Sequence, residues 1–161
     1  MMFEHTWHFF VRGQPVTQGS MRAFVVKGRP IITSANKNLK DWRTLVALQA
    51  QTEATAECPL DGPFSMTLEF YMPRPKSLKK SIMYPIGARS GDIDKCARAV
   101  LDALTSIFYK DDSQVVKLDV QKYWAMTGDV PQPPGVFVEI STNWLDDGND
   151  HQPRGFVEIS G

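Results

Sequence analysis

Residues 91–122 read GDIDKCARAVLDALTSIFYKDDSQVVKLDVQK, and the interpretation of the whole chain starts from this stretch. Asp92 and Asp94 stand just before a helical pattern, and Asp111 and Asp112 follow it, just before an alternating run typical of a strand. If that strand packs back beside the helix, acids from both ends of the helix can meet. Clustered carboxylates repel one another, and Mg²⁺ prefers oxygen ligands. We therefore predict that Asp92, Asp94 and Asp112 bind Mg²⁺.

The helix in this stretch is predicted over residues 94–108. Its core side is formed by Ala97, Val100, Leu101, Leu104 and Phe108. Asp94, Arg98 and Asp102 follow one another four residues apart and form a polar stripe beside it. Both acidic motifs also have purely structural readings, because Asp94 could cap the helix and residues 111–113 could form an ordinary turn.

The segments before this helix alternate between strands and one further helix. Residues 3–11 are aromatic and β-prone, and residues 20–33 have the pattern of a hairpin. Residues 38–56 lack Gly and Pro and predict an amphipathic helix, capped by Ser34 or Asn36. The apolar side of that helix is expected to hold Leu39, Trp42, Leu45, Val46 and Gln49. Residues 64–72 alternate cleanly, which predicts a strand with one buried face.

Two more strands are predicted after the helix, over residues 115–124 and 136–140. In the first, Val116, Leu118 and Val120 are expected to point inward. The pentapeptide FVEIS at 137–141 recurs at 156–160, but two copies are too few for a repeat architecture. We interpret residues 1–141 as one domain and residues 142–161 as an appended polar tail, whether ordered or disordered.

The composition is that of an ordinary globular domain. The 161 residues suit one domain with a real core, and no apolar run is long enough to span a bilayer. The N-terminus lacks a signal-like pattern, and only Cys58 and Cys96 are present, so a cytoplasmic protein without a structural disulfide is expected. The formal net charge is zero, yet the first 138 residues carry 17 of the 18 Lys and Arg and 13 of the 18 acids. A basic face is therefore compatible with the composition.

Basic side chains gather in the predicted hairpin and in a long loop over residues 73–91. The candidates for contacts with phosphate groups are Arg22, Lys27, Arg29, Arg74, Lys76, Lys79, Lys80 and Arg89, together with Lys122 in a later predicted strand. The loop contains no acid, and long loops in compact domains are often functional. A solvated linker is the alternative interpretation of the same loop.

The region from the DxD motif to DDSQV resembles the RusA family of Holliday-junction resolvases, which are common in phages and prophages. The family pattern is approximately KPDxDNLxKxxxDAL followed by DDxQV, and the chain reads SGDIDKCARAVLDAL and then YKDDSQV. The segments GQPVTQGSMRAF and PFSMTLEFYMPRPKS also resemble the family, so the likeness covers roughly residues 7–140. Two positions differ, since Lys95 replaces the family's Asn and Arg98 replaces its helical Lys. Ser90 and Gly91 stand where the family has Lys-Pro.

The resemblance implies an α+β fold, a single compact domain with a mixed β-sheet and two main helices, acting as a homodimer. It implies a Mg²⁺-dependent endodeoxyribonuclease, with Mn²⁺ as a substitute, that resolves four-way DNA junctions by paired symmetric cuts in recombination and repair. Asp92, Asp94 and Asp112 match the catalytic acids, and Asp111 matches their neighbour and is a further candidate ligand. Arg98 or Lys122 would then offset charge on the phosphate.

Two alternatives belong to other functional classes. One is a branched-DNA-binding protein of phage origin with impaired catalysis, for which Lys95 and Arg98 would be signs of decay. The other is a nucleotide-sugar transferase with a DxD motif, which needs a larger nucleotide-binding domain than 161 residues comfortably provide.

Overall fold

The computed structural model describes residues 4–19, 21–34, 37–126 and 131–142. Its elements in chain order are β1 (Thr6–Arg12), β2 (Met21–Val26), β3 (Arg29–Ser34), α1 (Leu39–Glu53), β4 (Phe64–Met72), η1 (Ala88–Ser90), α2 (Ile93–Leu104), η2 (Asp112–Gln114), β5 (Val115–Trp124) and β6 (Gly135–Ser141). The predicted α+β class with a mixed sheet and two helices is confirmed. Of the predicted tail, only Thr142 belongs to the described part of the chain, so the tail stays a prediction.

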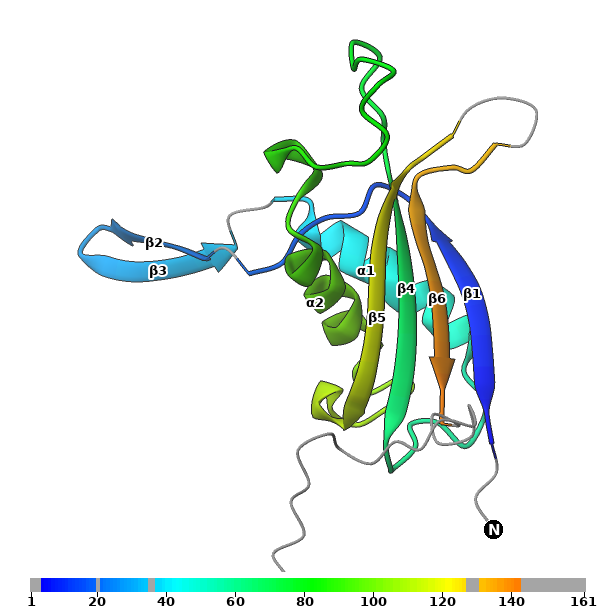
Figure 1. Cartoon of the computed structure of the whole chain (residues 1–161). Coiled ribbons are helices and arrows are strands. Elements are labelled where there is room, and N and C mark those ends of the chain that lie inside the picture. Colours follow the sequence, from blue (N-terminus) through cyan, green and yellow to red (C-terminus); the bar gives the residue numbers. More distant parts are fainter. Residues whose placement is uncertain (1–3, 20, 35–36, 127–130, 143–161) are drawn as a thin grey trace, which may run out of the picture.

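The main sheet has the strand order β1-β6-β4-β5. The pairs β1–β6 and β6–β4 are antiparallel, whereas β4 and β5 are parallel. Parallel neighbours need a long crossover, and here that connection contains the 73–91 loop and α2. As a result α2 lies beside β5, and the stretch quoted at the outset forms one side of the molecule (Figure 1).

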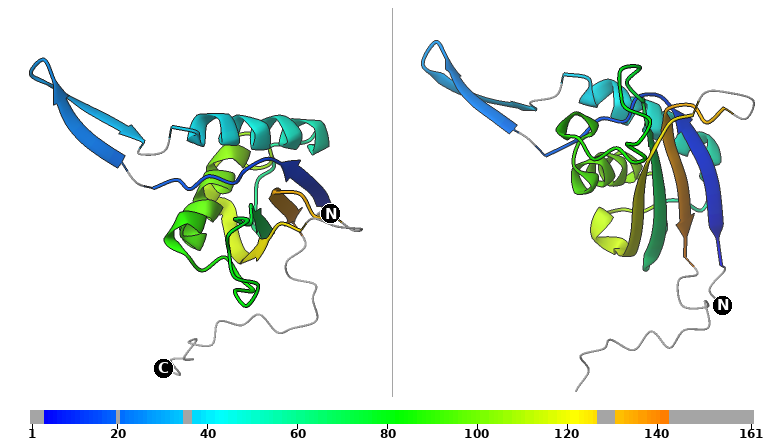
Figure 2. Two further views of the ribbon diagram at one scale, coloured as in Figure 1. Left: turned by 90° about the horizontal axis from the view of Figure 1, so that it is seen from above. Right: turned by 45° about the horizontal axis from the view of Figure 1, so that its top comes forward.

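Both helices lie on the same face of the main sheet (Figure 2). Alternation along the strands sends apolar side chains to that face, and β4 shows the predicted pattern in full, with every second residue buried. The largest fully buried side chains are Trp42, Tyr109, Phe64, Phe70, Phe108, Leu68, Leu104, Ile140, Val46, Val100, Val136 and Val138. The core is therefore a single layer between the sheet and the two helices.

The hairpin β2–β3 is a separate two-stranded sheet that projects away from this core (Figure 1). Lys27 and Gly28 form its turn, and both have positive φ angles of 50° and 74°. The tip residues Lys27 and Arg29 are exposed. The predicted hairpin is thus confirmed, and it extends beyond the domain at the end where α2 begins.

Several details of the predicted elements were wrong. Helix α2 ends at Leu104 rather than Phe108, because Ser106 adopts a positive φ of 68°, which a helix cannot contain. Leu45 is 45% exposed rather than part of the core side of α1. Neither Ser34 nor Asn36 caps α1, since Asn38 occupies the N-cap position without a side-chain cap bond.

Strand β5 also departs from the prediction. Val116 is 56% exposed because the register shifts at this point: Phe64 pairs with Val115 and Ser65 pairs with Lys117, which leaves Val116 without a partner on β4. Leu118 is on the helix-facing side of the strand but is still 42% exposed, because β5 is the edge strand. Among the described residues, no helix is long and apolar enough to cross a bilayer.

Candidate active site

Helix α2 presents a polar edge because its other side is fixed in the core. Cys96, Ala97, Ala99, Val100, Ala103 and Leu104 are buried. With that side anchored, Asp94 and Arg98 are exposed and Asp102 is half-buried. The predicted polar stripe is therefore confirmed, and α2 itself contacts the edge strand β5.

Asp92 and Asp94 mark the start of α2. Asp92 occupies the N-cap position with extended backbone angles, yet its side chain makes no cap hydrogen bond. Instead its Oδ2 lies 3.0 Å from Lys95 Nζ, and this bond raises the pKa of Lys95. Asp94 lies in the first turn, so it is not the N-cap residue, but its structural reading as an acid that charges the helix start agrees with the structure. Both carboxylates remain exposed, where the helix dipole favours negative charge.

The backbone before Asp92 is held from β5 by Lys122. Its Nζ donates hydrogen bonds to Gly91 O at 2.7 Å and to Ser90 Oγ at 3.3 Å. Gly91 has a φ of 77°, and a Cβ at this position would lie 2.3 Å from Thr17 Cγ2. Only glycine fits this approach without displacing the neighbouring segment. The sequence predicted that Lys122 binds a phosphate. In the structure its amine instead donates hydrogen bonds to the residues just before Asp92 and so holds the start of the acidic motif in place.

Asp111 and Asp112 lie in a turn that is locked beside the end of α2. Asp111 caps η2 by accepting a 2.8 Å bond from Ser113 N, which lowers the pKa of Asp111. Gln114 completes a capping box, and its amide also donates to Leu60 O and Gly62 O, each at 3.0 Å. Asp111 therefore has the structural role in a turn that the sequence allowed, and its bond from Ser113 N fixes the turn that carries Asp112.

Asp102 is the site residue that sequence reasoning missed. Burial, followed by the negative charges of Asp102 and Asp111, raises the pKa of Asp112, while Arg98 acts in the opposite direction. Asp102 thus lies close enough to Asp112 to form an acidic pair with it. The available signal was the spacing of four along α2, which places Asp102 at the end of the helix nearest the DDSQV turn.

The segment before β2 contacts α2 through Gln18 and orients this acid pair. The side-chain amide of Gln18 donates to Asp102 Oδ2, and the backbone N–H of Gln18 donates to Lys95 O at 3.0 Å. The Oε1 atom of Gln18 is buried and has no hydrogen-bond partner among the described residues. The segment that leads into the β2–β3 hairpin therefore also fixes one of the acids on α2.

The acids consequently stand in two groups along α2. Asp92 and Asp94 are at its start, and Asp102 lies eight residues beyond Asp94, about 12 Å along the axis at 1.5 Å per residue, next to Asp112. Within the described ranges, no three acidic, His or Cys side chains are close enough together to hold a metal ion. Arg98 lies between the two groups. It makes no ion pair with Asp94 or Asp102 within 4 Å.

The predicted DNA contacts fall into different structural situations. Arg74 donates to Ile82 O and Lys79 O, both at 3.0 Å, and lies 5.6 Å from the centre of the Trp124 ring, so it holds the loop together. Lys76, Lys79, Lys80 and Arg89 are exposed. The backbone of Arg22 belongs to β2, but its side chain is outside the described part of the chain.

Comparison with known proteins identifies a family that this chain matches. The family described as "Endodeoxyribonuclease RusA" matches residues 12–141. A Bacillus subtilis (strain 168) relative, described as "Uncharacterized protein YqaN", is 35% identical over 127 residues, which cover 73% of this chain and 87% of the relative. The matched region contains both acidic groups, the 73–91 loop and the β2–β3 hairpin.

Proposed function

This chain belongs to the RusA family of endodeoxyribonucleases, and from that membership we propose that it resolves four-way DNA junctions by two matched cuts. The observation that carries the proposal is the arrangement of the DxD motif and the DDSQV turn, at opposite ends of α2, within the matched region. A homodimer with two-fold symmetry would present two sites to two opposed strands of the junction. The cytoplasm of a bacterium or of a phage-infected host is the proposed location.

The proposal includes Mg²⁺, with Mn²⁺ as a substitute. Asp92 and Asp94 are the proposed ligands at the start of α2, and Asp112, with Asp102 and Asp111 near it, is the proposed ligand at the other end of the helix. Carboxylate oxygens are the donors that Mg²⁺ prefers. Burial, followed by the negative charges of Asp102 and Asp111, raises the pKa of Asp112, and a bound cation would offset the repulsion among these carboxylates, which supports a cation at this group. Bound metal would supply an activated water and offset negative charge on the phosphate.

The chain's own residues would position DNA and balance its charge. Arg98 is exposed between the two acidic groups, where a guanidinium can hold a phosphate oxygen. Lys122 keeps the first acids in place through Gly91. Lys27, Arg29, Lys76, Lys79, Lys80 and Arg89 provide exposed positive charge for the DNA backbone.

Cleavage of a synthetic four-way junction tests the proposal. The labelled junction is incubated with the protein in Mg²⁺, in Mn²⁺ and in EDTA, beside a linear duplex of the same sequence. We expect paired symmetric cuts in the junction only when a metal is present. Equal cleavage of the linear duplex would contradict junction selectivity, and cleavage in EDTA would contradict the role of metal.

A second candidate is a branched-DNA-binding protein with impaired catalysis, and the Asp92–Lys95 ion pair favours it. The ammonium group competes with a cation for this carboxylate. Junction binding in EDTA without cleavage in Mg²⁺ or Mn²⁺ would select this candidate. Replacing Lys95 with the family's Asn then separates the two functions, because Lys95→Asn should restore or raise cleavage and lower the Mg²⁺ concentration that it requires.

A further inference from the structure

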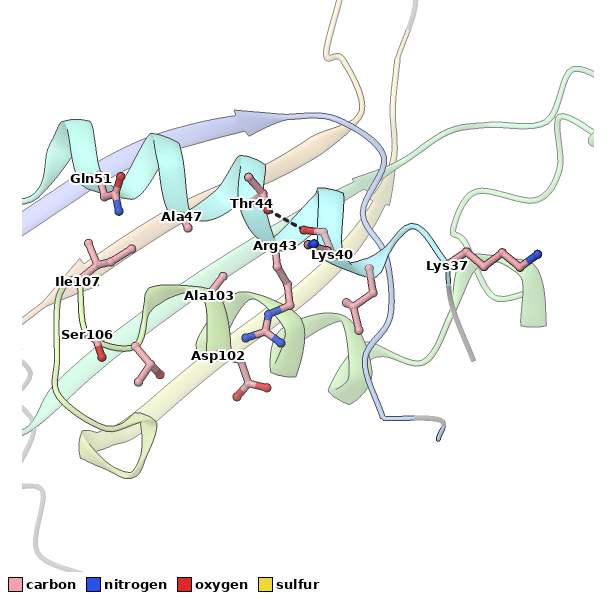
Figure 3. Close-up of a pocket in the computed structure, with 12 residues that line it drawn as sticks. Lys37, Lys40, Arg43, Thr44, Ala47, Gln51, Asp102, Ala103, Ser106 and Ile107 are labelled. Carbon is pink, nitrogen blue, oxygen red and sulfur yellow. Dashed lines mark hydrogen bonds between the residues drawn. The ribbon is translucent and has the colours of Figure 1, made fainter. Parts of the chain in front are cut away.

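A groove runs between α1 and the end of α2, with a volume of about 800 Å³ (Figure 3). One wall is α1 with Lys37, which stands two residues before the helix begins, and the other is the C-terminal part of α2 with the following turn. Ala47, Ala103 and Ile107 are among the residues that line the groove. The groove lies outside the loop and hairpin to which the sequence assigned DNA contacts.

The α1 wall is basic. Lys40 and Arg43 lie three residues apart in the first turns of α1 and so share one side of the helix, and Lys37 lies on the segment that precedes it. Lys37 and Lys40 are exposed, and in the described part of the chain none of the three forms an ion pair within 4 Å. The positive end of the α1 dipole adds to their charge. Three such cations on one wall suit a ligand with regularly spaced negative charges.

The groove connects this basic wall to the acidic site. Asp102 lines the groove and is also the acid that lies beside Asp112. Figure 3 shows the Arg43 side chain extending from α1 toward Asp102. A polyanion in the groove would therefore be held by Lys40 and Arg43, with Lys37 near its far end, and would end at the acids that the proposed function assigns to catalysis.

We propose that this groove holds the sugar-phosphate backbone of the DNA strand that leads away from the cut. The inference rests on the proposed function and names a binding track that the loop and the hairpin do not provide. Charge complementarity selects the occupant, because a strand of DNA carries a phosphate at every nucleotide and this wall of the groove carries three cations. The groove's volume of about 800 Å³ offers room for a short stretch of one strand.

Salt dependence of junction binding tests the track. Affinity for a labelled four-way junction is measured in EDTA over a salt series for the wild type and for the double variant Lys40→Gln/Arg43→Gln. Each lost phosphate contact lowers the slope of log affinity against log salt by about 0.9, so the double variant should lose about 1.8. The matched control is Arg12→Gln/Lys117→Gln, which removes the same charge from the sheet face opposite the helices and should keep the wild-type slope.

The single variants Lys40→Gln and Arg43→Gln keep the test decisive if the double variant folds poorly, with an expected loss of about 0.9 each. Wild-type binding and cleavage, combined with an unchanged slope in the groove variants, would overturn the track and leave the proposed function intact. A slope loss equal to that of the control would also overturn it. If the wild type neither binds nor cuts the junction, the proposed function fails and the track fails with it.

Discussion

Among the site residues, Arg98 is the one for which the structure best separates two possible roles. The sequence left two readings open, a ladder of ion pairs along α2 and a group that holds the scissile phosphate. No ion pair within 4 Å joins Arg98 to Asp94 or Asp102 in the described structure, while its charge reaches Asp112. The ladder would in any case contribute only about 0.3–0.5 kcal/mol per pair. The phosphate role is therefore the better interpretation.

Arg98→Ala should slow single-turnover junction cleavage by ~10² or more and leave the melting temperature nearly unchanged, because it removes one donor to the transition state. Arg98→Lys should recover much of the rate, since it keeps the charge that the family has at this position. Cleavage by folded Arg98→Ala close to the wild-type rate would show that Arg98 does not hold the phosphate.

The neighbouring acids Asp111 and Asp112 should respond oppositely to neutralisation. The pKa of Asp112 is raised in the folded protein, so its ionised form destabilises the fold above that pKa, and the cost disappears as the pH falls through it. Asp112→Asn should therefore raise the melting temperature of the metal-free protein at pH 7, with the gain shrinking in acid.

Asp111→Asn is the matched control for that measurement. Its pKa is lowered by the bond from Ser113, so the ionised form stabilises the fold above the unfolded-state pKa and this stability is lost as the pH falls. The control should lower the melting temperature at pH 7. Thermal melts from pH 3 to pH 8 check the direction of both changes in melting temperature. A lower melting temperature for Asp112→Asn would show that ionised Asp112 does not destabilise the fold.

At the scale of the elements, the sequence pattern predicted a strand or helix well where that element has packing neighbours on each side. β4 lies inside the sheet, so its alternation translates directly into burial. β5 is an edge strand with a register shift at Val116, and sequence periodicity does not reveal either property. The end of α2 was placed too late because Phe108 is buried like a helical core residue, although it follows the turn at Ser106.

The same limit explains what was missed in the site. The DxD and DDSQV motifs were visible because their spacing is local. The contacts of Lys122 with Gly91 and of Gln18 with Asp102 span 31 and 84 residues, and no local pattern predicts them. The basic row on α1 was also missed, because only the packing of α1 against α2 gives it a groove.

The link between β5 and the start of α2 makes a test at this scale. Lys122→Met should cost about 1 kcal/mol of unfolding free energy through the lost bonds to Gly91 and Ser90. Because Asp92 then loses its anchored position, single-turnover cleavage should fall while junction affinity changes little. Lys79→Met in the exposed loop is the comparison, and it should reduce affinity and leave the rate of bound complexes unchanged.

The opposite pattern for Lys122→Met is equally informative. A loss of affinity with an unchanged cleavage rate would mean that the amine contacts a phosphate, as the sequence predicted, and that its bonds to Gly91 and Ser90 give way when DNA binds.

At the scale of the whole molecule, the fold separates its tasks. The sheet and core support α2, the hairpin and the 73–91 loop extend from the end where α2 begins, and the α1–α2 groove approaches the other acidic group (Figure 1). Neutral net charge is compatible with this arrangement because basic side chains lie in those extensions and along α1. A junction bound by two copies would then meet both acidic groups of each subunit.

The central proposal is that both acidic groups, Asp92 with Asp94 at the start of α2 and Asp112 beyond its end, are required for one metal-dependent cut. The most direct measurement is single-turnover cleavage of a labelled four-way junction in Mg²⁺ by the wild type and by Asp92→Asn, Asp94→Asn and Asp112→Asn, with junction binding measured in EDTA. We predict paired symmetric cuts by the wild type and no cleavage by any of the three variants, all of which bind the junction as tightly or more tightly, because each loses a ligand and a repulsive charge. Wild-type cleavage by any one variant would contradict its place in the site.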